Sequence, residues 1–86
     1  MARYLVELYL SRMGAGGLEA AVARARAAAD AATHEGEPVR CLRSIFVPEE
    51  ETWFLLYDGP STQAVENAVA RAALPCERVV EAVTQP

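Results

Sequence analysis

The segment from Arg3 to Leu10, RYLVELYL, most constrains what this chain can fold into. It is rich in leucine, aromatic and β-branched residues, and it is short enough to be a single strand. Side chains alternate between the two faces of a strand. One face then carries Tyr4, Val6, Leu8 and Leu10, and the other carries Leu5, Glu7 and Tyr9. Because both faces are largely apolar, the segment predicts a central strand that is covered on both sides.

An alanine-rich segment from Leu18 to His34 predicts the first helix, since small and apolar residues recur there at helical spacing. The glycine-rich residues 13–17 before it predict a loop. Gly36 is a natural residue to follow the helix, and Pro38 prevents the helix from resuming.

The rest of the chain predicts two strands, a helix and a last strand. Residues 39–47 and 52–57 are strand-like, and the acidic residues 49–51 between them fit a solvated hairpin connection. Ser61 is placed to cap a helix that runs to about Ala73. The final strand covers residues 78–84.

This order of elements, β-α-β-β-α-β, predicts an α+β protein with the ferredoxin-like fold. Two right-handed crossovers of this kind interleave into a four-stranded antiparallel sheet with strand order 4-1-3-2 and both helices on one face. A chain of 86 residues is too short for two hydrophobic cores, so residues 1–86 are expected to form one domain.

Charge and composition exclude several functional classes. The formal net charge of −4, without a basic tract, argues against nucleic-acid binding. No apolar stretch is long enough to span a membrane, and no secretory signal is recognisable, so the expected location is the cytoplasm. Cys41 and Cys76 form neither a CxxC pair nor a disulfide framework, and both are expected to be reduced.

The predicted sheet has one face that no helix covers. Two alternating sets from the third strand are possible on that face. They are either Trp53, Leu55 and Tyr57, or Phe54, Leu56 and Asp58. Neither set is polar enough to face water, so we expect a symmetric homodimer that packs sheet on sheet as a dimeric α/β barrel, or else a ligand that fills the face.

Glu7 and Glu81 interrupt the apolar alternation of two strands that are neighbours in the predicted order. On the open face, two carboxylates would hold a cation or share a proton. The alternative is a structural ion-paired cluster with Arg43, which alternation could place on that face with Cys41 and Ile45.

Three aromatic residues, Tyr9, Trp53 and Tyr57, fit either a pocket for a flat organic ligand or ordinary core and dimer packing. His34 fits either a helix cap or a metal ligand. Cys41 fits either a small buried side chain or a soft metal ligand.

Several segments also carry a family resemblance. They are YLVE in the first strand, LRS followed by VPEEET, FLLYDGPS, and ALP followed by RVVEAV. In these segments the chain resembles domain-of-unknown-function family 4242, small bacterial ferredoxin-like proteins that include a nickel-binding member. The resemblance implies the same fold, a dimer and, where nickel is bound, histidine and carboxylate ligands on the open face. Where relatives carry a histidine before the second-strand serine, this chain has Arg43 before Ser44, and its only histidine is His34.

The function expected from the sequence is a non-enzymatic, homodimeric binding module for a metal ion such as nickel, by resemblance, or for a small ligand. The alternatives are a cofactor-independent, monooxygenase-like enzyme of the dimeric α/β-barrel type and a purely structural or interaction protein. The candidate ligand-binding residues are Glu7, Tyr9, Arg43, Ser44, Trp53, Tyr57 and Glu81. The candidate metal ligands are Glu7, Glu81, His34 and Cys41.

Overall fold

The computed structural model describes residues 2–9, 17–83 and 85. Along the chain they form β1 (Ala2–Tyr9), α1 (Gly17–His34), β2 (Arg40–Val47), the 3-10 helix η3 (Pro48–Glu50), β3 (Thr52–Gly59), α2 (Thr62–Arg71) and β4 (Cys76–Ala82). The predicted β-α-β-β-α-β order is confirmed. The predicted glycine-rich loop lies outside the described residues, except for Gly17, which begins α1.

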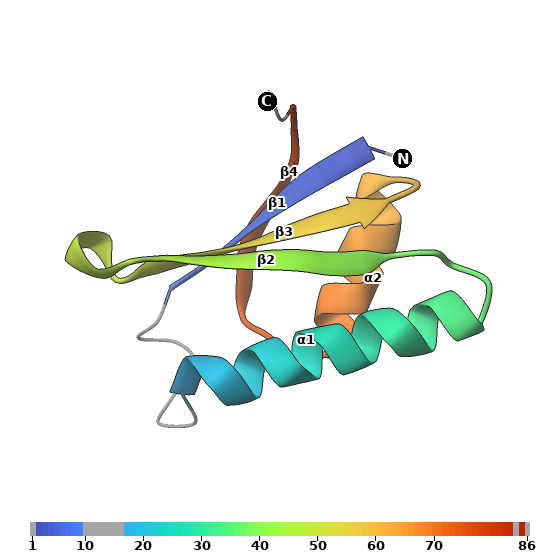
Figure 1. Ribbon diagram of the computed structural model, residues 1–86, viewed down its shortest axis with the longest axis horizontal. Coiled ribbons are helices and arrows are strands. Elements are labelled where there is room, and N and C mark those ends of the chain that lie inside the picture. The colour runs from blue at the N-terminus through green and yellow to red at the C-terminus, as the bar shows by residue number, and fades with distance from the viewer. Residues whose placement is uncertain (1, 10–16, 84, 86) are drawn as a thin grey trace.

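The four strands form one sheet in the order β2-β3-β1-β4, and all neighbouring strands are antiparallel. This is the predicted strand order read from the other edge. Both helices lie on one side of the sheet (Figure 1), where α1 packs against β2 and α2, and α2 packs against β3 and β4. The arrangement confirms the ferredoxin-like α+β fold. Among the described residues, no helix is both long and apolar enough to cross a membrane.

The hydrophobic core lies between the sheet and the helices. The central strands supply Tyr4, Val6, Leu8, Trp53, Leu55 and Tyr57, all buried. The helix α1 supplies mainly alanines, namely Ala21, Ala25, Ala28, Ala29 and Ala32. Because burying a large side chain removes more apolar surface from water than burying alanine, the aromatic and aliphatic residues of the strands contribute most of the hydrophobic stabilisation.

The strands contain two irregularities that change which residues share a face. In β2, the register with β3 shifts between Cys41 and Arg43. Such a bulge moves the residues beyond it to the opposite face from the one that strict alternation predicts. In β4, the strand begins at Cys76, two residues before the predicted start, and its register with β1 shifts between Glu7 and Leu8.

Both predicted helix signals are present. Gly36 has a φ of +99°, and the amides of Gly36 and Glu37 donate to the carbonyls of Thr33 and Ala32, which closes the end of α1. Ser61 caps α2, because its side-chain oxygen accepts a hydrogen bond from the Ala64 amide at 3.1 Å.

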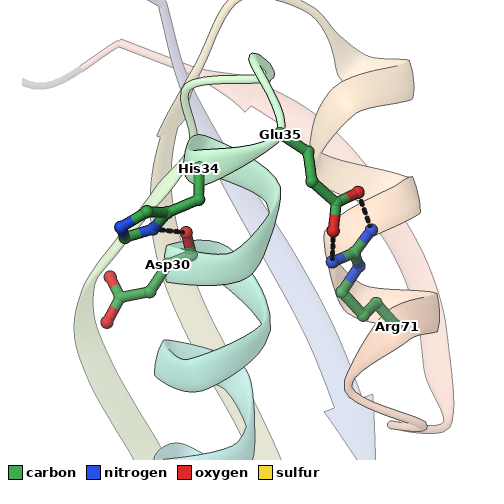
Figure 2. A network of polar contacts seen from close by, with 4 residues as sticks. All are labelled: Asp30, His34, Glu35 and Arg71. Atoms are coloured by element: carbon green, nitrogen blue, oxygen red, sulfur yellow. Dashed lines mark hydrogen bonds and ion pairs between the residues drawn. The ribbon is translucent and has the colours of Figure 1, made fainter.

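An ion pair joins the ends of the two helices (Figure 2). Arg71 of α2 donates from both terminal nitrogens to the two carboxylate oxygens of Glu35, at 2.8 and 2.7 Å. The hydrogen bond and the charge of Arg71 lower the pKa of the Glu35 carboxyl. Both side chains are exposed, so the pair orients the helix ends and adds little stability.

At Gly59, the last residue of β3, α2 packs close to the backbone of the sheet. A methyl group at this position would lie 2.9 Å from Val65 Cγ2 and 3.3 Å from Val39 Cγ1, both in the buried core. The first distance is shorter than a normal van der Waals contact, so no side chain fits unless a neighbour moves.

We therefore expect Gly59→Ala to lower the free energy of unfolding by about 1–3 kcal/mol. In a Val65→Ala background, the same substitution should cost less, because the closest clashing methyl group is gone. Urea unfolding of the two single variants and the double variant measures this coupling. An equal cost of Gly59→Ala in both backgrounds would contradict the proposed clash.

Candidate functional site

The candidate site is the sheet face opposite the helices, here called the uncovered face. Strand pairing arranges its side chains in three rows across the sheet. The rows are Ala82, Arg3, Asp58 and Arg40; then Val80, Leu5, Leu56 and Arg43; then Arg78, Glu7, Phe54 and Ile45. Tyr9 follows Glu7 on the same face. The uncovered face thus combines an apolar centre with charged residues around it.

The apolar centre is only partly shielded from water. Leu56 is 8% exposed, whereas Ile45 and Val80 on the outer strands are 46% and 39% exposed. Leu5 and Phe54 between them are half-buried. A run of apolar side chains from one sheet edge to the other is the kind of surface that a partner or ligand covers.

Two ion pairs lie on the uncovered face. The Arg78 Nε donates to the Glu7 Oε1 at 2.7 Å, and the Arg3 Nε lies 3.2 Å from the Asp58 Oδ1. The Glu7 side chain is 17% exposed. Since a partly buried carboxylate needs a partner, Arg78 accounts for the charged Glu7 inside an apolar strand. The structure therefore gives Glu7 the partner Arg78 and not the predicted Arg43.

Two further arginines, Arg40 and Arg43, lie on β2 with exposed side chains. Within the described parts of the chain, neither side chain forms a hydrogen bond or ion pair. Arg43 was predicted as a partner for carboxylates and as a candidate ligand-binding residue, whereas Arg40 and Arg78 were not predicted to be part of the site. The alternating positions of these arginines along β2 and β4 were the signal in the sequence that could have located them.

Glu81 does not join Glu7, and the predicted carboxylate pair is wrong. In the β1–β4 register, Glu81 pairs with Tyr4, which faces the helices, while Arg78 pairs with Glu7. Glu81 therefore points to the helix side of the sheet, where it is exposed. The strand itself was predicted, but its residues were assigned to the wrong faces of the sheet, as if the alternation were shifted by one residue.

Trp53 and Tyr57 do not lie beside Tyr9. Both are fully buried on the helix side, because they pair with the core residues Leu8 and Tyr4. The expectation that they share a pocket with Tyr9 is corrected, and the other set, with Phe54 and Leu56, faces away from the helices. Ser44 also lies on the helix side, where its hydroxyl accepts a hydrogen bond from the Trp53 indole at 2.8 Å.

Cys41 is also on the helix side, because of the bulge in β2. It was expected on the same face as Arg43 and Ile45, and only those two share the uncovered face. Burial raises the pKa of the Cys41 thiol despite the nearby Arg26, and burial with the charge of Glu66 raises that of Cys76. Both thiols are therefore protonated at neutral pH and are poor nucleophiles.

His34 lies at the end of α1, beside Asp30 (Figure 2), and is exposed. Its Nδ1 is 2.9 Å from the backbone carbonyl oxygen of Asp30, a contact that requires a proton on Nδ1. The Nε2 lone pair of the neutral ring is then left to accept a proton or bind a metal.

The predicted metal ligands Glu7, Glu81, His34 and Cys41 are not brought together. Glu7 is on one face, Glu81 and Cys41 are on opposite edges of the other, and His34 is on a helix end. In residues 2–9, 17–83 and 85, no three histidine, cysteine, aspartate or glutamate side chains gather into a group that could hold a metal ion.

Comparison with known proteins identifies one family. A family model described as "Nickel responsive protein SCO4226-like" matches residues 4–82. The crystal structure of SCO4226 from Streptomyces coelicolor A3(2) superimposes with a TM-score of 0.68 at 23% sequence identity, covering 99% of this chain and 100% of that one. At this identity, the structural match supports the fold alone. The chain matches no curated protein.

The buried Tyr57 hydroxyl has no hydrogen-bond partner in the described structure. Burial raises the pKa of Tyr57 far above its ordinary value, and the neighbouring Cys41 raises it further. An unfolded tyrosine ionises near pH 10, so above that pH the unfolded state loses a proton that the folded state keeps. The contribution of Tyr57 to stability therefore falls as the pH rises above about 10.

We expect Tyr57→Phe to leave the free energy of unfolding at pH 7 unchanged or to raise it by up to about 1 kcal/mol, because it removes an unsatisfied buried hydroxyl. The variant should also lose less stability than the wild type between pH 9 and 11. Urea unfolding across that pH range measures both effects. A large loss of stability at pH 7 would show that the hydroxyl has a partner.

Proposed function

The chain belongs to the SCO4226-like family of nickel-responsive proteins, and from this membership together with the uncovered face we propose that it is a homodimeric binding module in a nickel-related process. In this proposal, two uncovered faces meet as a dimeric α/β barrel and enclose a site for a small ligand. The module binds its ligand and does not transform it.

The observation that carries the proposal is the apolar centre of the uncovered face. Ile45 and Val80 expose much of their surface at its two ends, with Leu5, Leu56 and Phe54 between them. A second copy presents the same apolar centre, and two sheets pack with their faces about 10 Å apart. A two-fold dimer thus covers each apolar centre with its counterpart.

The described residues do not fit a nickel ion within one protomer. Nickel(II) is bound by several imidazole, thiolate or carboxylate donors at once. Here, the Glu7 carboxylate is held by Arg78, and the other candidate ligands lie elsewhere. The nickel-related part of the proposal rests on family membership, whereas the geometry of the uncovered face favours a small ligand.

An enzymatic role has less support from the site. A general base must be able to take up a proton, but the Glu7 carboxylate is engaged with Arg78 at 2.7 Å. Cys41 and Cys76 have raised pKa values, so they are not activated nucleophiles.

We expect the wild-type protein to be a dimer by native mass spectrometry and light scattering at micromolar concentration. Ile45→Asp should shift it towards the monomer, because the substitution places an unpaired charge in the apolar centre. The matched control is Val83→Asp, which introduces the same charge at an exposed valine beyond the end of β4. A monomeric wild type, or equal effects of both variants, would contradict the proposed interface.

Titration with nickel chloride tests the nickel-related part of the proposal. We expect Glu7→Gln to leave any Ni²⁺ binding measured by calorimetry unchanged, because Arg78 occupies the Glu7 carboxylate. Binding through the free Nε2 of His34 should be weak and should disappear in His34→Ala. A stoichiometric nickel site that is lost in Glu7→Gln would contradict this expectation and place the metal on the uncovered face.

A further inference from the structure

We propose that the ligand of the uncovered face is a small anion with carboxylate or phosphate oxygens, held by Arg40 and Arg43. This inference rests on the proposed function, since the anion would lie between two uncovered faces of a dimer. It adds the chemical class of the ligand, which neither the fold nor the family description gives.

The sign of the charge on the uncovered face is the first support. The four strands place four arginines and two carboxylates there, for a net charge of +2. The whole chain has a net charge of −4. Positive charge is thus concentrated on one face of an acidic protein, and such a face attracts anions and repels bare cations.

The ion pairs on the uncovered face show which arginines carry the excess positive charge. Glu7 is engaged by Arg78, and Asp58 is engaged by Arg3. Arg40 lies opposite Asp58 in the strand register, but no bond between the two is formed. The unneutralised positive charge is therefore on Arg40 and Arg43, both on β2.

The spacing of the two arginines suits one oxyanion. They occupy successive ladder positions on the same face, opposite Asp58 and Leu56, which places their Cα atoms roughly 7 Å apart. Arginine side chains are long and flexible, so both guanidinium groups can reach one acceptor above the face from these positions, although Arg40, at the edge of the sheet, also borders the groove between α1 and β2. A guanidinium donates two parallel hydrogen bonds to a carboxylate or phosphate, so two of them satisfy several oxygens of one group.

Dimer formation would favour a bound anion. When a second sheet packs over the uncovered face, Arg40 and Arg43 lose part of their water, and a buried charge must be paired. The two carboxylates of the same face are already engaged. A bound anion supplies the missing negative charge next to the apolar centre.

The test is isothermal titration calorimetry of the full chain with two probes in turn, citrate and inorganic phosphate. We expect saturable binding of at least one probe, weakening as salt is added. Arg43→Gln should weaken it at least tenfold. The matched control, Arg26→Gln, removes the same charge from an exposed arginine on α1, on the other side of the sheet, and should change affinity less than twofold.

The probe that binds more tightly identifies the class of oxyanion. No binding of either probe by the wild type would overturn the proposal. Equal weakening by Arg26→Gln and Arg43→Gln would also overturn it, because the anion would then respond to overall charge or lie in the groove between α1 and β2 that Arg26, Asp30 and Arg40 line.

Native mass spectrometry of the same samples separates this inference from the proposed function. A dimer that binds neither anion removes the inference and leaves the dimeric module intact. A monomer that binds neither removes both. If the Arg43→Gln variant remains a dimer and loses anion binding, the result supports both the inference and the proposed function. The arginine then contributes to ligand binding and not to the dimer interface.

Discussion

Both helices cover the same face of the four-stranded sheet, and the rest of this structure depends on that arrangement. The helix side is filled by large strand residues and by the alanines of α1. The other face of the central strands still carries Leu5, Phe54 and Leu56. The strands are therefore apolar on both sides although the monomer has a core on only one, and the proposed dimer and ligand site both depend on the remaining apolar surface.

Most of the fold could be predicted because its signals are local or periodic. The Gly36 and Ser61 positions mark helix ends through the backbone conformation and the hydrogen bonds that they provide. The order of strands and helices leaves few topologies once crossovers must be right-handed. What could not be predicted was the face assignment in β2 and β4, where Cys41 and Glu81 were placed wrongly. In β2, a bulge between Cys41 and Arg43 reverses the faces, and no residue type in the strand indicates it. In β4, the pairing with β1 decides which of the two alternating sets faces the helices, and the sequence of the strand does not reveal that choice.

The candidate site was harder to predict for the same reason. Both alternating sets of β3 are apolar, so composition could not decide whether Trp53 or Phe54 faces the helices. The choice depends on pairing with β1, where Leu8 lies opposite Trp53 and Glu7 opposite Phe54. Glu7 was recognised as unusual from the sequence, but its partner Arg78 depends on the β4 register, which only the folded chain reveals.

Position 43 shows how a relative of nickel-responsive proteins can present a different chemistry on the same fold. The resemblance implies a histidine before the second-strand serine, and a neutral imidazole there can donate a lone pair to a metal ion. Arg43 cannot, because a guanidinium keeps its proton and has no lone pair to offer. With the remaining carboxylates of the face held by Arg3 and Arg78, a permanent cation in place of a metal donor favours an anion over a cation in the site that we propose. Family membership therefore accounts for the scaffold, while in our proposal the charges on the uncovered face determine the class of ligand.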